Sequence, residues 1–217
     1  MRELVVSTFM SLDGVMQAPG GPEEDPAGGF EHGGWSVPHW DDVMMGWMGE
    51  SMGKPFDLVL GRKTYEIFAA HWPHVDEPGA AELNAATKHV ASRTLDRLDW
   101  QNSHLLEGDV SDAVRRLKEH DGPELQVHGS SNLLQTLQRD DLVDEYRLMM
   151  FPVVLGFGKR LFEPGVAPVG LGLAESRISS TGVVIARYRR AGEVGHGSFA
   201  REEPTPEEVE RRARLEE

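Results

Sequence analysis

Three short stretches begin with glycine or serine and continue with cationic, hydroxyl or amide side chains, and each lies at the C-terminal end of a short predicted strand. They are Gly61–Thr64 (Gly-Arg-Lys-Thr), Ser92–Arg93 and Gly129–Asn132 (Gly-Ser-Ser-Asn). The segments before them read as short strands, and the residues after the two glycines favour the first turn of a helix. Such a helix start presents free N–H groups and the positive end of the helix dipole, and this combination binds anions, above all phosphate.

The third stretch is the one around which we expect the other two to be arranged. Leu125–His128 is predicted to be a strand that breaks at Gly129, where glycine permits an unusual backbone conformation and the close approach of a ligand. Ser130, Ser131 and Asn132 are residue types favoured at the N-cap and in the first turn of a helix. An ordinary strand–turn–helix with a serine cap has the same pattern, so this junction alone does not establish a phosphate site.

Taken together, the three stretches predict a dinucleotide site. Ligands of open α/β sheets bind at the carboxyl ends of the strands, which is where all three stretches are expected. Arg62, Lys63 and Arg93 would hold a ribose phosphate, and the helix after Gly129 would hold a pyrophosphate. A phosphate on the ribose favours NADPH as the cofactor. The predicted cofactor-binding residues are Gly61, Arg62, Lys63, Thr64, Ser92, Arg93, Gly129, Ser130, Ser131, Asn132 and Leu133.

Other site chemistries find little support in the sequence. No Gly-x-Gly-x-x-Gly motif follows the first predicted strand, so the Rossmann fingerprint is missing. Leu155–Lys159 (Leu-Gly-Phe-Gly-Lys) lacks the Walker spacing, and Arg160 stands where a serine or threonine would be needed. His71 and His74 flank Trp-Pro in a predicted loop with only Asp76 nearby, so we predict no metal site. The sequence has no cysteine, which excludes disulfides and thiolate catalysis.

The composition is that of a globular protein with an acidic surface. The chain has 217 residues, 39% hydrophobic and 27% charged, with a formal net charge of −14. That charge disfavours nucleic acid or an anionic membrane as a general partner. The N-terminus enters a strand pattern without a signal peptide, and no apolar run is long enough to span a membrane. We therefore expect a cytoplasmic protein.

Strand and helix patterns alternate along most of the chain and then give way to a hairpin. Strands are expected at 3–9, 56–60, 88–92, 103–106, 125–128 and 143–151, and helices near 42–52, 62–68, 79–87, 109–120 and 130–138. Two final strands, 171–179 and 183–190, are expected to pair around Ser180–Gly182. This order predicts one α/β sheet that is mostly parallel, with antiparallel strands at one edge.

Two segments lack any periodicity. Residues 18–34 are rich in glycine, proline and acids, and a mobile loop of this length either covers a site or is a solvated insertion. From Gly195 onward the chain is charged and almost free of apolar residues. We expect one domain over 1–192 and a flexible tail over 193–217, in preference to the charged helix that 206–215 could form.

Five segments, in order, carry a resemblance to a known family. They are Ser11–Gly14, Leu58–Glu66 (the most specific), Ala91–Arg93, Val127–Ser130 and Pro152–Phe162. On these motifs residues 2–190 resemble the dihydrofolate reductase superfamily, and more closely the reductase domain of the bifunctional riboflavin-biosynthesis deaminase–reductase and its stand-alone relatives. The resemblance implies a three-layer α/β fold with a mostly parallel central sheet and an antiparallel C-terminal hairpin. The family has two glycines at its pyrophosphate turn, and here Ser130 replaces the second.

The resemblance implies an NADPH-dependent reductase of a small heterocycle that is pyrimidine- or pterin-like, as in 5-amino-6-(5-phosphoribosylamino)uracil reduction. In folate reductases an acid at the start of the first helix holds the pterin, and Trp35–Asp41 is similar in composition with one extra residue. Asp41 is therefore a catalytic candidate by analogy, and Asp13 is a second one. Asp41 could equally be a plain helix N-terminal acid, and Asp13 a plain turn residue.

Several alternatives stay open on the sequence alone. Trp35, Trp40, Trp47 and Met16 could form the apolar walls of the substrate site or belong to the core. The chain could bind NADP(H) without turnover, or it could be a true dihydrofolate reductase. The relatives imply a homodimer.

Overall fold

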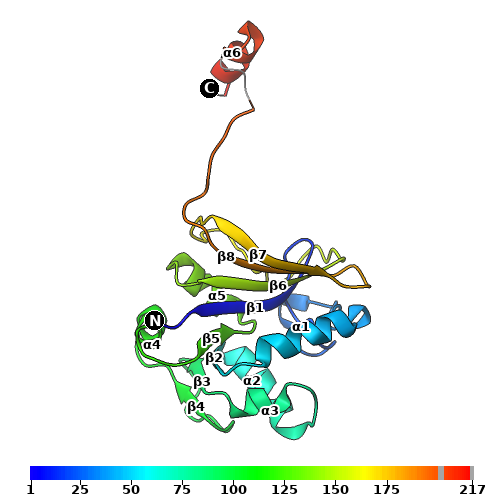
Figure 1. Ribbon diagram of the computed structural model, residues 1–217, viewed down its shortest axis with the longest axis vertical. Coiled ribbons are helices and arrows are strands. Elements are labelled where there is room, and N and C mark those ends of the chain that lie inside the picture. Colours follow the sequence, from blue (N-terminus) through cyan, green and yellow to red (C-terminus); the bar gives the residue numbers. More distant parts are fainter. Residues whose placement is uncertain (200–202, 216–217) are drawn as a thin grey trace.

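The computed structural model describes residues 1–199 and 203–215 (Figure 1). Its strands are β1 (Leu4–Ser11), β2 (Phe56–Gly61), β3 (Lys88–Ala91), β4 (Ser103–Leu105), β5 (Glu124–Val127), β6 (Glu145–Phe151), β7 (Leu171–Ile178) and β8 (Val184–Arg190). Its α-helices are α1 (Asp42–Met52), α2 (Arg62–His71), α3 (Ala80–Ala85), α4 (Val110–Glu119), α5 (Ser131–Arg139) and α6 (Pro206–Ala213). Short 3-10 turns are η1 (Ala27–Gly29), η2 (Val37–His39) and η3 (Trp72–His74).

The strands form one sheet in the order β4-β3-β2-β5-β1-β6-β8-β7. All neighbours from β4 to β6 pair in parallel, whereas β8 runs antiparallel to β6 and β7 antiparallel to β8. Figure 1 shows the β7–β8 hairpin at one edge of the sheet and β4 at the other. The predicted mostly parallel sheet with an antiparallel C-terminal hairpin is confirmed.

Alternating residues of the central strands separate the two faces of the sheet. Leu4 and Val6 of β1 belong to a core that also holds Val114 of α4 and Leu134 of α5. On the other face, Phe9 packs against a core that contains buried residues of α1. A third core lies between β2, α2 and α3. Helices therefore cover both faces, which gives the expected three layers. Because β1, β5, β2 and β3 pair in parallel, their carboxyl ends lie at a common edge of the sheet.

The segment 18–34 is held in place by one buried side chain, that of Gln17. Its amide nitrogen donates to the carbonyls of Asp25 (2.8 Å) and Ala27 (2.9 Å), and its amide oxygen accepts from the N–H of Lys159 (3.0 Å). The indole N–H of Trp35 donates to the Gln17 carbonyl at 2.8 Å. The segment predicted as a mobile loop thus has internal anchors on both sides.

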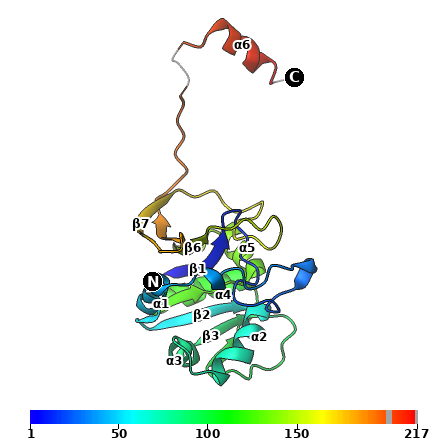
Figure 2. The same cartoon turned by 90° about the vertical axis from the view of Figure 1, so that its right-hand side faces the viewer.

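The C-terminal segment differs from the expected tail, since α6 is helical over Pro206–Ala213. Thr205 caps it by accepting the N–H of Glu208 (3.3 Å), and Glu208 forms ion pairs with two arginines one turn later. Figures 1 and 2 show α6 apart from the sheet. Residues 200–202 and 216–217 of the predicted tail lie outside the described residues. Within the described ranges, no helix is both long and apolar enough to cross a membrane.

Candidate active site

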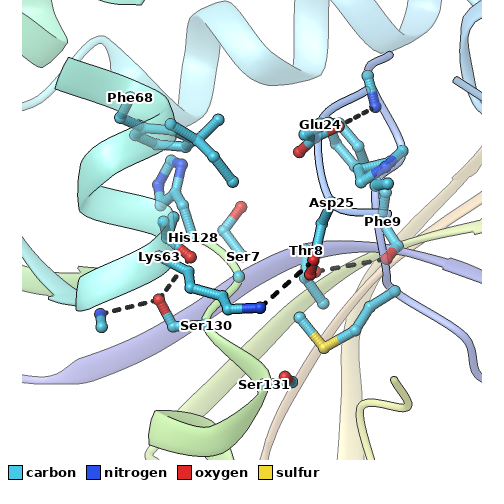
Figure 3. A pocket seen from close by; sticks show the side chains of 18 of the residues that line it. Ser7, Thr8, Phe9, Glu24, Asp25, Lys63, Phe68, His128, Ser130 and Ser131 are labelled. Atoms are coloured by element: carbon cyan, nitrogen blue, oxygen red, sulfur yellow. Dashed lines mark hydrogen bonds and ion pairs between the residues drawn. The ribbon is translucent and has the colours of Figure 1, made fainter. Parts of the chain in front are cut away.

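A large cleft opens at the carboxyl ends of β1, β2, β3 and β5, with a volume of about 1340 Å³ (Figure 3). Its floor includes Ser7–Phe9 of β1, Gly61 of β2, Ala91 of β3 and His128, which directly follows β5. Pockets for one drug-sized ligand usually enclose about 300–1,000 Å³. The cleft is therefore large enough for a dinucleotide together with a second small molecule.

The cleft brings together every residue that the sequence predicted for the cofactor. Three separate strand–helix or strand–loop junctions meet there, as expected for carboxyl ends of parallel strands. The predicted residues that line it are Gly61, Arg62, Lys63, Thr64, Ser92, Arg93, Gly129, Ser130, Ser131, Asn132 and Leu133.

Helices α2 and α5 both start at the cleft without a side-chain cap. Gly61, the N-cap of α2, has no side chain that could cap the helix, and the side chain of Ser130, the N-cap of α5, accepts no hydrogen bond from its own helix. By contrast, Asp41 caps α1 and Asp109 caps α4 through their carboxylates. The first-turn N–H groups of α2 and α5 are thus left for another acceptor, and an anion in the cleft would satisfy them.

Ser130 fastens the two helix starts to each other. Its hydroxyl oxygen accepts the N–H of Gly61 at 2.8 Å and donates to the hydroxyl of Thr64 at 2.7 Å. A Cβ on Gly61 would lie only 3.1 Å from the Ser130 Cβ, so a larger residue at this position would press against Ser130. Both Gly129 and Ser130 have left-handed backbones, with φ of 83° and 66°. Ser130 therefore keeps the conformation that a second glycine would adopt. Because serine has a Cβ, this left-handed backbone is less favourable for it than for glycine.

Two substitutions of Ser130 separate these contributions. Ser130→Ala should lower the free energy of unfolding by about 1–3 kcal/mol, because the partly buried Gly61 N–H loses its acceptor. Ser130→Gly loses the same hydroxyl but relieves a left-handed backbone that costs roughly 1–2 kcal/mol, so it should be the more stable variant. Urea unfolding of both variants measures the order, and an alanine variant as stable as the glycine variant would refute this explanation.

The three predicted phosphate-binding cations differ in their partners. Arg62 pairs with Glu66 one turn along α2 (Nη1 to Oε1, 3.1 Å), and the Lys63 ammonium lies 3.6 Å from the Asp25 carboxylate. Arg93 is exposed and has no carboxylate partner within the described ranges. It is therefore the cation that is most readily available to an anionic ligand.

A local turn holds Arg93 at the rim of the cleft. The hydroxyl of Ser92 accepts the N–H groups of Thr94 (3.2 Å) and Leu95 (3.0 Å). This turn bends the chain immediately after β3, so that Arg93 lies at its tip. The role of Ser92 at this turn is positioning of its neighbour.

Glu24 and Asp25 form the wall opposite Ser130 and His128 (Figure 3). Burial acts to raise the pKa of Asp25, but the hydrogen bond and charge of Lys159 hold that pKa below its ordinary value. Burial raises the pKa of Glu24 above its ordinary value, against a hydrogen bond from the N–H of Gly20 (2.6 Å). The cleft therefore contains a carboxyl group that keeps its proton to a higher pH than an exposed glutamate.

The sequence of this chain matches a known protein family over most of its length. The model of the RibD C-terminal domain matches residues 2–185. The chain belongs to this family. Its curated relatives include the uncharacterized protein YyaP of Bacillus subtilis (strain 168), which is 26% identical over 196 residues, with 88% of this chain and 96% of YyaP covered.

Solved structures show the same fold. A putative riboflavin biosynthesis protein from Shewanella sp. PV-4 superposes with a TM-score of 0.61 at 20% identity, covering 87% of this chain and 99% of that one. Dihydrofolate reductase from Enterococcus faecalis, complexed with NADP(H) and RAB-propyl, gives a TM-score of 0.52 at 15% identity over 87% and 96% of the two chains. The dihydrofolate-reductase-like fold predicted for this RibD C-terminal domain is confirmed.

Neither of the two predicted catalytic aspartates lines the cleft of this RibD C-terminal domain. Asp41 accepts the N–H of Met44 (3.0 Å) with one carboxylate oxygen and both the N–H and the hydroxyl of Ser180 (2.7 Å each) with the other. These bonds lower its pKa and join the start of α1 to the β7–β8 turn. The placement supports the plain helix-cap interpretation of Asp41.

Asp13 also serves the backbone. Its carboxylate accepts from the Ser11 hydroxyl (2.6 Å) and from the N–H groups of Leu155 (3.1 Å) and Gly156 (2.9 Å). Burial acts to raise the pKa of Asp13, but these hydrogen bonds lower it to about 2. A carboxylate this acidic and already occupied is a poor proton donor, so the geometry supports the turn role that the sequence left open.

A substitution tests the structural role of Asp41. Asp41→Ala removes the cap of α1 and should lower the free energy of unfolding by about 1–2 kcal/mol, while NADPH affinity stays within the error of calorimetry. Thermal unfolding and a nucleotide titration of the same variant provide both numbers. A variant of unchanged stability that has lost turnover would restore the catalytic interpretation.

The sequence predicted only some of the residues that form the apolar wall of the cleft. Met16 and Trp40 line the cleft, as one alternative predicted, whereas Trp35 and Trp47 belong to the core against α1. Helix α1 adds Met45, Met48 and Met52, spaced three and four residues apart, and α2 adds Ile67 and Phe68.

The sequence offered His71 and His74 as possible metal ligands. His71 lines the cleft, and its Nε2 lies 3.5 Å from Oε2 of Glu77. Residues 1–199 and 203–215 contain no group of three potential ligands that could hold a metal ion.

Proposed function

We propose that this RibD C-terminal domain is an NADPH-dependent reductase of a small, flat heterocycle of the pyrimidine or pterin type. The observation that carries the proposal is the pair of uncapped helix starts, at Gly61 and Ser130, in one cleft with Arg93, a cation that has no carboxylate partner among the described residues. The family and the NADP(H) complex of its dihydrofolate reductase neighbour support the same cofactor.

The donor set of this chain fits a dinucleotide with a ribose phosphate. The first-turn N–H groups of α5 (Ser131 onward) would hold the pyrophosphate, because the Ser130 side chain does not cap them. Arg93 would hold the ribose phosphate, as arginine does in sites that choose NADP over NAD. The cofactor supplies the hydride when it is bound.

The remaining part of the cleft suits a flat ring. Trp40, Met48 and Phe68 are partly buried side chains that line it, and the methionines can adapt to the outline of a heterocycle. The substrate would gain a hydride at the carbon of its C=N or C=O bond and a proton at the nitrogen or oxygen. We propose Glu24 as the group that supplies this proton, because it is the carboxyl in the cleft whose pKa burial raises.

An oxidation assay tests the proposal. Purified protein is mixed with NADPH or NADH and with a panel of oxidised heterocycles that includes dihydrofolate, other pterins and the aminouracil ribosyl phosphate substrate of riboflavin biosynthesis. We expect NADPH oxidation with at least one pyrimidine or pterin and little oxidation of NADH. Tight NADPH binding without oxidation by any compound would favour a non-catalytic binding protein. Dihydrofolate as the preferred substrate would show a true folate reductase.

We also propose a homodimer that uses the hairpin edge. Strand β7 ends the sheet, and the apolar side chains of Leu173 (58% exposed) and Ile178 (72% exposed) are open on it. An unpaired strand edge with apolar side chains is a ready surface for a second copy. Sedimentation of the full chain would give twice the monomer mass if this is correct, and the monomer mass at all concentrations if it is not.

A further inference from the structure

One face of β5 carries a line of polar side chains that leads into the cleft. Glu124, Gln126 and His128 point to the same side of the strand, because side chains alternate in a β-strand. Leu125 and Val127 point to the other side and belong to the core with α4 and α5. Gln126 is almost fully buried, at 1% exposure, so its amide must find its partners within the protein.

The hydrogen bonds along this line form a chain with a defined direction. Arg147 donates to both carboxylate oxygens of Glu124, at 2.7 and 2.8 Å. The amide nitrogen of Gln126 donates to Glu124 Oε1 (2.6 Å) and to the carbonyl of Ser51 (3.3 Å). The amide oxygen of Gln126 then lies 2.6 Å from Nε2 of His128. Because a carboxylate only accepts and Gln126 uses its nitrogen for it, the amide oxygen must accept from the His128 ring.

This direction fixes where the imidazole carries its hydrogen. Nε2 of His128 must be the protonated nitrogen, since it faces an acceptor. Burial, together with the charge of Arg147 and against that of Glu124, lowers the pKa of His128 to about 4, so the ring is neutral near pH 7. Nδ1 consequently carries a lone pair and no hydrogen.

Nδ1 of His128 has no hydrogen-bond partner in the described part of the chain. It is also not one of the fully buried polar atoms without a partner, so this nitrogen keeps some exposed surface. His128 lines the cleft, where its ring stacks on Phe56 with 6.3 Å between the ring centres and 17° between the planes. Ser7 is its neighbour on β1, next to the paired Val6 and Val127, and its hydroxyl has no partner in the described ranges either. Figure 3 shows Ser7 and His128 close to each other.

We propose that Nδ1 of His128 is a permanently oriented hydrogen-bond acceptor that positions a planar ring through one of its N–H donors. His128 would thus be a positioning residue, and the line Arg147–Glu124–Gln126 would hold it in the accepting tautomer. An amide-type N–H has two sources in this cleft, namely the carboxamide of a nicotinamide and the ring N–H of a pyrimidine or pterin. The identity of the ring rests on the proposed function, whereas the tautomer does not.

Nitrogen NMR of the unliganded full chain tests the tautomer. In histidine-labelled protein, the His128 signals are assigned by their loss in His128→Phe. We expect a pyridine-type Nδ1 and a pyrrole-type Nε2 that stay unchanged from pH 8 to pH 6, and an averaged pair of signals in Gln126→Leu. A pyrrole-type Nδ1, or a ring that becomes protonated within this pH range, would overturn the proposal.

Ligand analogues then distinguish the two sources. NADP⁺ is compared with its 3-acetylpyridine analogue, which lacks the carboxamide N–H, on wild type, His128→Phe and His128→Asn. If the carboxamide is the donor, wild type should prefer NADP⁺ by about 3- to 10-fold, the preference should vanish in His128→Phe, and His128→Asn should restore part of it. If the substrate is the donor, NADP⁺ binding stays constant and His128→Phe weakens a pterin relative to its N-methylated form.

The outcomes also separate this inference from the proposed function. NADP⁺ binding with neither discrimination present would overturn the role of His128 and leave the reductase intact. Failure of NADP⁺ to bind would instead remove the proposed function, while the nitrogen spectra would still report the tautomer. The stacking partner Phe56 keeps its contact in His128→Phe, so a general loss of folding is not expected.

Discussion

Arg93→Ala should weaken NADPH binding by about 10- to 100-fold and leave NADH binding within about twofold. Arg93 lines the cleft after β3 and has no carboxylate partner in the described ranges, so its charge is available to the ribose phosphate. NADH lacks this phosphate and would not lose a contact. Arg62→Ala should have a smaller effect, because the Arg62 guanidinium already pairs with Glu66 at 3.1 Å. Calorimetric titration of each variant with both nucleotides measures these differences.

Arg97 provides the matched control for this prediction. It is an exposed arginine in the loop after β3 that pairs with Asp99 and does not line the cleft. Arg97→Ala changes the net charge by the same amount, so it reports any long-range electrostatic effect. An equal loss of NADPH affinity in Arg93→Ala and Arg97→Ala would show that Arg93 makes no specific contact. A loss shared equally by NADPH and NADH would place Arg93 elsewhere on the nucleotide.

Glu24→Gln should reduce the rate of substrate reduction by about 10²- to 10⁴-fold, the usual contribution of a positioned general acid. Glutamine keeps the size of the side chain but has no acidic proton, so NADPH affinity should not change. Only the protonated carboxyl can donate, and burial raises its pKa. The wild-type rate should therefore fall as pH rises through this pKa, and the variant should lose that dependence. Single-turnover rates with the substrate found in the oxidation assay provide the measurement.

The neighbouring Glu23 is the control for Glu24. It also lines the cleft but is exposed. Glu23→Gln removes the same negative charge and should keep most of the activity. A variant Glu24→Gln with wild-type rates at all pH values would assign proton transfer to a bound water or another group. Equal losses in both variants would indicate an effect of charge on binding rather than a proton donor.

The proposed cofactor-binding residues could be predicted from the sequence because their determinants are local. Glycine, hydroxyl and cationic residues directly after an apolar strand specify a helix start, and parallel strands bring such starts to one edge. This reasoning placed Gly61, Arg93 and Gly129 in one cleft correctly. It did not reveal that Ser130 joins the junctions, because the partners Gly61 and Thr64 lie 69 and 66 residues away.

The proposed proton donor and positioning residue could not be predicted in the same way because their places depend on contacts between distant segments. Asp41 looks like a site residue by its position at a helix start, yet its carboxylate is used by Ser180, 139 residues later. Glu24 lies in a segment without periodicity, so only the folded loop shows that it faces the cleft. The sequence shows His128 only as the end of a strand, and the role proposed for it depends on the orientation of Gln126 and Glu124.

The paired cations show the same limit. From the sequence, Arg62, Lys63 and Arg93 are equally good candidates for binding a phosphate, because each is a cation that closely follows a predicted strand. The structure distinguishes the three by their partners. The Asp25 carboxylate, in a distant loop, lies 3.6 Å from the Lys63 ammonium, and Arg62 forms an ion pair with Glu66. Local context would have suggested the second pair, which has helical i, i+4 spacing, but not the first.

The cleft at the uncapped starts of α2 and α5 should bind NADPH, and a calorimetric titration of the wild-type protein with NADPH and with NADH tests this most directly. We predict saturable binding of NADPH at one site per chain, at least about tenfold tighter than NADH because of the additional phosphate contact. Absence of binding for both nucleotides, or equal affinity for the two, would contradict this assignment of the cleft.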